Sequence, residues 1–68
     1  MNLTDKYMKE IIEAGYEAGK KNAINKYKKY GFVKPFRFCK CPEKYSKYDF
    51  IYRDSYFEGY CEVFYEYS

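Results

Sequence analysis

The 68-residue sequence predicts a mainly α protein, a two-helix hairpin with a long first helix and an extended basic connection. Three observations predict it. Apolar and small residues recur at three- and four-residue steps over residues 3–30, two prolines interrupt the next segment, and acidic residues near the C-terminus are spaced four apart. The alternative is an α+β fold, in which the long helix is followed by a small antiparallel sheet. A chain this short is expected to form a single domain over residues 1–68.

The first expected helix covers residues 3–30. Its core-facing positions are Leu3, Tyr7, Met8, Ile11, Ile12, Gly15, Ala18, Gly19, Ala23, Tyr27 and Tyr30. Asn2 is expected to cap the helix, with Asp5 as its capping-box partner, and Gly31 is expected to end it in the left-handed conformation. At 1.5 Å per residue this helix is ~40 Å long. It therefore needs a partner along its length, and a homodimer is one candidate.

Two glycines, Gly15 and Gly19, lie inside the first helix one turn apart. Each costs up to ~1 kcal/mol relative to alanine in a helix interior. Small side chains allow another backbone or a flat ring to approach closely. The pair predicts either a packing notch for the protein's own aromatic residues or a contact with a second protein.

The connection covers residues 31–47. Pro35 and Pro42 favour extended backbone at the residues before them. Cys39 and Cys41 lie here and Cys61 follows later, an odd number that does not suit a disulfide scaffold. Their spacing does not match the usual zinc sites. We expect free thiols that pack as small apolar groups, with no metal and no cofactor.

The segment 48–67 fits two patterns. As a helix it carries an acidic stripe at steps of four, formed by Asp54, Glu58, Glu62 and Glu66. Its other face then carries Tyr48, Tyr52, Tyr56, Tyr60, Val63 and Tyr67. Alternation of polar and apolar residues also fits a strand, but β-branched residues are nearly absent, which favours the helix.

Charge is strongly segregated along the chain. The net charge is only +3, but residues 20–47 carry ten cations against a single carboxylate, Glu43. In an antiparallel hairpin the acidic stripe would lie beside the acidic start of the first helix. The molecule would then have one acidic end and one basic end, each suited to an outside partner.

Aromatic side chains lie among the cations of this basic segment, and the combination predicts contact with RNA. Lysines neutralise phosphates and rings stack on unpaired bases. The expected contact residues are Lys20, Lys21, Lys28, Lys29, Lys34, Arg37, Lys40, Phe36 and Phe38.

Three short stretches resemble the ribosome modulation factor family of small bacterial and phage proteins. They are Gly15-Tyr16-Glu17-Ala18-Gly19, Cys41-Pro42 and the aromatic-x-x-Gly-aromatic motif within residues 53–60. This chain has Tyr56 and Tyr60 where the family usually carries tryptophan, and a longer gap before Cys-Pro. The resemblance implies a helix over residues 47–66 and a ribosome or ribosomal RNA partner.

Other functional classes are weighed against RNA binding. A phage or mobile-element inhibitor would bind a host defence or replication protein through an acidic Tyr-rich face, with Tyr52, Tyr56, Glu58, Glu62 and Glu66 as contacts. A nucleotide sponge would need an oligomer to form a pocket.

An enzyme is not expected, because the chain has no histidine and no Gly-rich phosphate loop. No apolar run is long enough for a membrane span. The first residues lack a secretory signal, so we expect a cytoplasmic protein.

Overall fold

The computed structural model describes residues 4–37 and 39–67, and these form two long helices. Helix α1 spans Asp5–Tyr30 (26 residues) and α2 spans Asp49–Tyr67 (19 residues). A short 3₁₀ helix, η1 (Glu43–Tyr48), leads directly into α2. The mainly α class is confirmed, and the described residues contain no strand, so the α+β alternative does not hold for them.

The ends of α1 are set by local capping. Thr4 has extended backbone, and its hydroxyl oxygen accepts a hydrogen bond from the Tyr7 amide at 3.1 Å. The helix therefore begins at Asp5, two residues later than the start predicted from the sequence. The predicted cap, Asn2, lies outside the described residues. Gly31 ends the helix with φ 82°, and its amide donates to the Tyr27 carbonyl at 2.8 Å. The expected glycine cap is confirmed.

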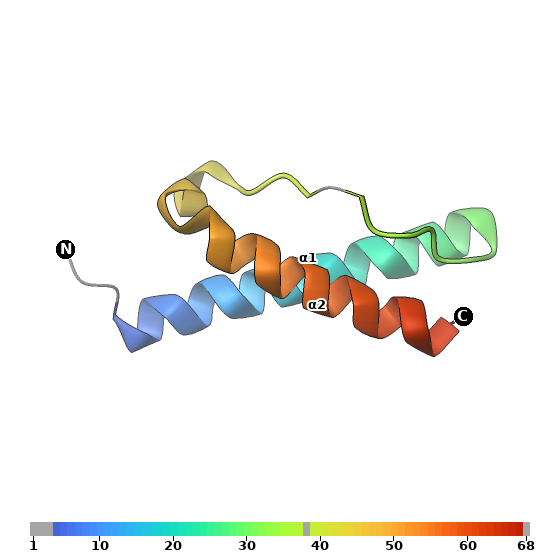
Figure 1. The fold of residues 1–68 in the computed structure, drawn as a ribbon, viewed down its shortest axis with the longest axis horizontal. Coiled ribbons are helices and arrows are strands. Elements are labelled where there is room, and N and C mark those ends of the chain that lie inside the picture. The colour runs from blue at the N-terminus through green and yellow to red at the C-terminus, as the bar shows by residue number, and fades with distance from the viewer. Residues whose placement is uncertain (1–3, 38, 68) are drawn as a thin grey trace.

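The two helices run in the same direction (Figure 1). Residues near the start of α1 meet the residue directly before α2, since the rings of Tyr7 and Tyr48 lie 5.9 Å apart. Residues near the two C-termini also meet, since the rings of Tyr27 and Tyr67 lie 4.6 Å apart. The antiparallel direction expected for the second helix was wrong.

The extended connection makes the parallel direction possible. It returns along the whole helix pair before η1 turns the chain into α2 (Figure 1). The segment 31–42 between α1 and η1 has twelve residues, which can span up to about 40 Å at ~3.3 Å per residue. The molecule measures 44 Å along its longest axis. A short loop could only have joined antiparallel neighbours.

Glycines let the helices approach closely where they cross. A Cβ placed on Gly15 would lie 2.5 Å from the Tyr52 carbonyl oxygen, and one on Gly19 would overlap the Tyr56 carbonyl. In return, Gly59 of α2 lies against the backbone of Tyr16. The notch thus packs within the protein, as the first of the two expectations has it, but main-chain atoms of Tyr52 and Tyr56 occupy it where aromatic rings were expected. The backbone of α2 fills it, so no second protein can reach it.

The core is built largely from tyrosines. The buried apolar residues are Ile11, Ala23, Val33, Cys39, Tyr45, Tyr52, Tyr56, Tyr60 and Val63. Three of these tyrosines form hydrogen bonds through their hydroxyls: Tyr45 donates to the Glu10 carboxylate at 2.8 Å, Tyr60 donates to the Lys34 carbonyl, and Tyr56 accepts from the Asn22 amide. No buried side-chain polar atom among the described residues lacks a hydrogen-bond partner.

The parallel direction also changes the distribution of charge. The acidic stripe of α2 runs toward the end of the molecule that holds the lysines of α1, and the Tyr16 hydroxyl donates to Glu62. The expected separation into an acidic end and a basic end is therefore wrong. Neither helix is long and apolar enough to cross a membrane, as judged over the described residues.

Candidate nucleic-acid interface

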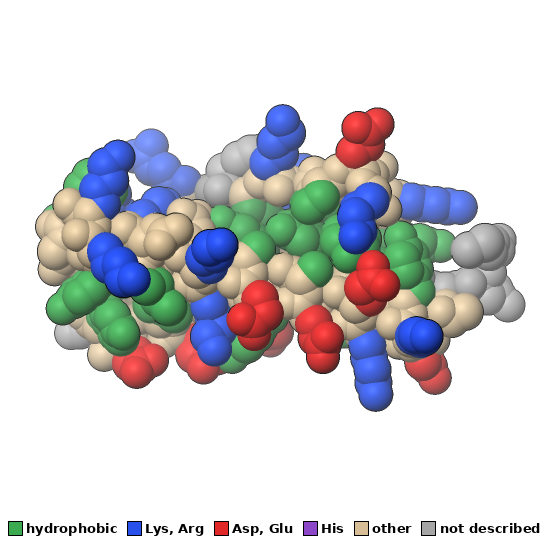
Figure 2. Space-filling model, turned by 180° about the vertical axis from the view of Figure 1, so that it is seen from behind, with side chains coloured by type: hydrophobic (Ala, Val, Ile, Leu, Met, Phe, Trp, Pro, Cys, Tyr) green, Lys and Arg blue, Asp and Glu red, His purple; other side chains and the backbone are tan. Residues whose placement is uncertain are grey.

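A basic, ring-lined hollow of roughly 720 Å³ lies where α1 ends and the connection begins. Its lining residues are Lys26, Tyr30, Lys34, Pro35, Phe36 and Arg37. The left-handed turn at Gly31 folds the connection back over the last turns of α1, so that both segments contribute side chains. The space-filling view shows several Lys and Arg side chains at this end of the molecule, beside hydrophobic side chains (Figure 2).

Tyr30 lies between two lysines at the rim of the hollow. The Lys34 ammonium lies 3.9 Å from the centre of the Tyr30 ring, and that of Lys29 lies 5.4 Å from it. The positive charge of Lys29, followed by that of Lys34, lowers the pKa of the Tyr30 hydroxyl. The lowered pKa indicates a local potential that favours negative charge, as a phosphate-binding surface requires.

Tyr60 is a buried residue of α2 that packs against the residues of the hollow. Its side chain is only 1% exposed, and its hydroxyl donates a hydrogen bond to the Lys34 carbonyl. The Lys26 ammonium lies 5.1 Å from the centre of the Tyr60 ring, on its face. Tyr60 thus fixes the backbone of the connection at the residue whose side chain covers Tyr30.

Phe36 anchors the connection to α2. Its ring lies 5.1 Å from that of Phe57 and 5.4 Å from that of Tyr60, edge to face in both cases. It is half-buried, so only part of the ring is left to meet a ligand. Of the two phenylalanines predicted to contact RNA, Phe36 therefore also serves the packing of the fold, while Phe38 lies outside the described residues.

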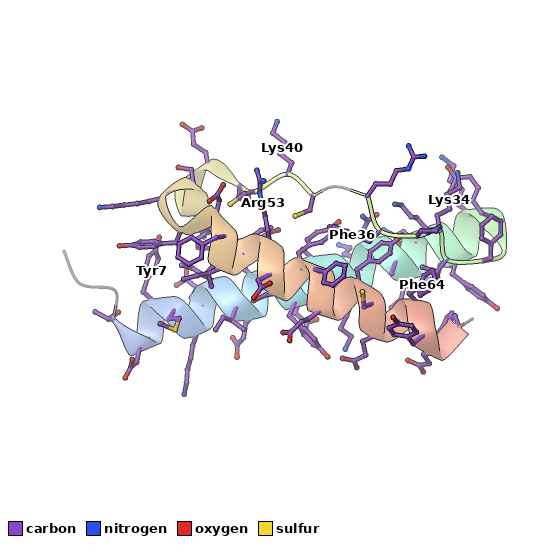
Figure 3. The ribbon with its side chains drawn as sticks, in the orientation of Figure 1. Tyr7, Lys34, Phe36, Lys40, Arg53 and Phe64 are labelled. Carbon is purple, nitrogen blue, oxygen red and sulfur yellow. The ribbon has the colours of Figure 1, made fainter. Side chains whose placement is uncertain are left out.

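The structure brings some of the predicted basic residues together and leaves others apart. Lys34 and Arg37 line the hollow, Lys29 lies at its rim, and Lys28 is exposed on the last turns of α1. Lys20, Lys21 and Lys28 line a separate, shallower hollow on α1. Lys40 lies farther along the connection and points away from the helices (Figure 3).

Three lining residues, Lys26, Tyr30 and Pro35, were not among the predicted contacts. Lys26 and Tyr30 lie four residues apart on α1, so they share one face of the helix. That spacing could be recognised in the sequence. The sequence did not indicate that the connection returns onto the same face of the helix.

The acidic face differs from the expected protein-binding surface. Tyr52 and Tyr56 are only 5% and 8% exposed, and burial raises the pKa of both hydroxyls. Both therefore belong to the core and cannot serve as contacts for a partner. Glu58, Glu62 and Glu66 are exposed, as that interpretation requires.

The three cysteines are free and do not converge on a metal. Cys39 is buried, which raises the pKa of its thiol, and Cys41 and Cys61 are half-buried. No three metal-ligating side chains come together in residues 4–37 and 39–67.

Comparison of the chain with protein-family models, with curated proteins and with solved structures found no match. Its function is therefore inferred from its own residues.

Proposed function

We propose that this protein is a small non-enzymatic regulator that binds RNA through the basic hollow and the exposed lysines beside it. The ribosome is the target that the resemblance to the ribosome modulation factor family suggests. The observation that carries the proposal is the hollow itself, which Lys26, Lys34 and Arg37 line together with the rings of Tyr30 and Phe36.

The chemistry of the hollow favours unpaired nucleotides. Ammonium and guanidinium groups bind phosphate oxygens, and partly exposed rings stack on bases that are not paired. A hollow of this size lies within the range of small-ligand sites, roughly 300–1,000 Å³. It can hold a nucleotide, whereas a duplex would present its phosphates to the outer lysines only.

The test replaces three cations of the hollow and its rim together. A Lys29→Gln/Lys34→Gln/Arg37→Gln variant should bind a single-stranded RNA oligonucleotide more weakly in fluorescence anisotropy. The slope of log affinity against log salt should fall by up to about 0.7 for each phosphate that the variant no longer neutralises. The matched control, Lys6→Gln/Lys9→Gln/Lys47→Gln, removes the same charge from exposed positions away from the hollow.

The control separates a site from general attraction. Equally weakened binding in the two triple variants would mean that only net charge matters, and the proposed site would then be wrong. To identify the target, the wild-type protein is used to capture partners from lysate with and without RNase. Partners that survive RNase would indicate a protein target in place of RNA.

The inhibitor alternative is weakened by the burial of Tyr52 and Tyr56. It still predicts that Glu58→Gln/Glu62→Gln/Glu66→Gln abolishes partner capture, whereas RNA binding should be unchanged or slightly tighter in that variant. These opposite outcomes distinguish the two functions.

A further inference from the structure

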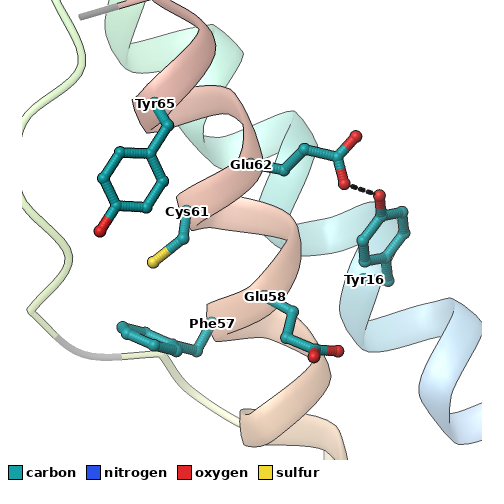
Figure 4. A pocket seen from close by; sticks show the side chains of 6 residues that line it. All are labelled: Tyr16, Phe57, Glu58, Cys61, Glu62 and Tyr65. Atoms are coloured by element: carbon teal, nitrogen blue, oxygen red, sulfur yellow. Dashed lines mark hydrogen bonds between the residues drawn. The ribbon is translucent and has the colours of Figure 1, made fainter.

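The exposed face of α2 carries two ridges of side chains, each following a row of every fourth residue. One ridge is Phe57, Cys61 and Tyr65, and the other is Glu58 and Glu62 (Figure 4). With Tyr16 of α1 these residues line a shallow groove of roughly 450 Å³. The groove shares no lining residue with the basic hollow.

The apolar ridge leaves much ring surface in water. Phe57 is 47% exposed and Tyr65 is 74% exposed. Cys61, with its smaller side chain, lies between them and makes a low point in the ridge. Contiguous exposed rings with a polar border are typical of interaction surfaces.

The geometry indicates what kind of element fits. When two helices pack, a ridge of residues from one lies in a groove between ridges of the other, and rows at every fourth residue form such ridges and grooves. The groove between Phe57–Cys61–Tyr65 and Glu58–Glu62 is of this type. An apolar ridge from another helix could bury Phe57 and Tyr65 in it.

The negative charge on α2 indicates which residues must flank the apolar ridge of the partner helix. α2 has no Lys or Arg after Arg53, while Glu58 and Glu62 border the groove and Glu66 continues the stripe. The Tyr16 hydroxyl donates to the Glu62 carboxylate, which raises the pKa of Tyr16 and holds that carboxylate at the groove. On the α1 side the Lys20 ammonium lies 5.1 Å from the centre of the Tyr16 ring. On the α2 side, where the carboxylates lie, a partner therefore needs Lys or Arg beside its apolar residues. A second copy docking by the same α2 face would bring two acidic ridges together, and like charges oppose that.

We propose that this groove binds an amphipathic helix of a partner protein, with apolar residues along one face and Lys or Arg along its border. The inference goes beyond RNA binding and rests on different lining residues, and the two surfaces meet where Phe57 packs against Phe36. It assigns the protein a second surface, on α2.

The test uses three labelled synthetic peptides. The first is helical, with leucines on one face flanked by lysines; the second carries glutamates in place of lysines; the third is the first with its residues scrambled. In fluorescence anisotropy only the first peptide should bind, and added salt should weaken its binding. If the glutamate peptide or the scrambled peptide binds as well as the first, or if none binds, the proposal is wrong.

Variants locate the binding. Tyr65→Ser removes a ring from the ridge, and Cys61→Gln fills the low point between the two rings. Each substitution should weaken binding of the first peptide about tenfold or more, as expected for a change at the centre of an interface. Phe32→Ser, which removes an exposed ring elsewhere, should change binding by no more than about twofold. Unchanged binding in both groove variants, with circular dichroism showing that they remain helical, would overturn the proposal.

Two further measurements separate the alternatives. Sedimentation of the protein alone should show a monomer; a dimer that Cys61→Gln dissociates would mean that a second copy occupies the groove, and the proposal would be wrong. Lys29→Gln/Lys34→Gln/Arg37→Gln should still bind the peptide, and Tyr65→Ser should still bind RNA. Failure of one function then leaves the other intact.

Discussion

Gly19 of α1 lies against the main-chain carbonyl of Tyr56 in α2, with no room for a side chain between them. Gly59 makes the reciprocal contact with the backbone of Tyr16. The two helices thus meet backbone to backbone at their crossing, and the tyrosine rings of α2 fill the space on either side. This contact fixes which residues of α2 lie opposite each turn of α1.

Gly19→Ala should therefore destabilise the protein. Alanine favours an isolated helix by about 1 kcal/mol over glycine, but its methyl group would overlap the Tyr56 carbonyl. We expect the overlap to outweigh this gain, so that the free energy of unfolding in urea falls by about 1–3 kcal/mol.

Asn25→Ala is the matched control, because residue 25 is exposed on the same helix. Its free energy of unfolding should stay within about 0.5 kcal/mol of the wild-type value. A Gly19→Ala protein more stable than the wild type would show that the helices do not touch there.

The parallel direction of the helices predicts specific contacts in solution. Nuclear Overhauser effects should connect the ring protons of Tyr27 with those of Tyr67, and those of Tyr7 with those of Tyr48, because these ring pairs are in contact. Tyr27→Phe and Tyr48→Phe variants would assign the signals. Cross-peaks between Tyr7 and Tyr67 would instead mean that the helices are antiparallel.

The hydrogen bond from Tyr60 to the Lys34 carbonyl should hold the connection in place. Tyr60→Phe keeps the ring and removes the donor, at a cost of about 0.5–1.5 kcal/mol. Trypsin should then cut after Arg37 faster than in the wild type, as followed by mass spectrometry. Tyr27→Phe, which alters an exposed tyrosine on α1, should leave the rate unchanged. Equal rates in all three proteins would show that this bond does not restrain the connection.

Stability should fall at alkaline pH because of the buried tyrosines. Burial raises the pKa of Tyr52 and Tyr56 above the ordinary value of 10.0. Above that value the unfolded chain releases these protons while the folded chain keeps them, so unfolding becomes more favourable as pH rises. The loss of stability begins near the ordinary tyrosine pKa and is complete above the raised one.

Urea titrations at a series of pH values check this prediction. The free energy of unfolding should decrease above roughly pH 10, and it should decrease less steeply in a Tyr52→Phe/Tyr56→Phe variant. Tyr30→Phe serves as the contrast, because nearby lysines lower the pKa of Tyr30. In that variant the free energy of unfolding should not decrease less steeply than in the wild type. If the double variant loses stability as steeply as the wild type, ionisation of Tyr52 and Tyr56 does not drive the decrease.

The candidate sites could be predicted only in part. The charge pattern pointed to Lys34 and Arg37, but the exposure of a ring could not be read from residue type. Tyr52 and Tyr56 looked like contacts for a partner and are buried, whereas Phe57 and Tyr65 are exposed beside them on the same helix. Which face of α2 is covered depends on where α1 and the connection lie.

The sequence by itself determined the first helix and its end, and it favoured a helix over a strand for residues 48–67. Three features indicated them: the periodicity of apolar residues, the acidic stripe at steps of four, and the glycine at position 31. Each of these signals depends on residues a few positions apart, so each can be recognised in the local sequence. Only the tertiary structure decided that the helices are parallel. The tyrosine face of α2 could pack on α1 in either direction. The choice rests on contacts between distant residues, such as Gly19 with Tyr56, and on a connection long enough to return along the whole pair.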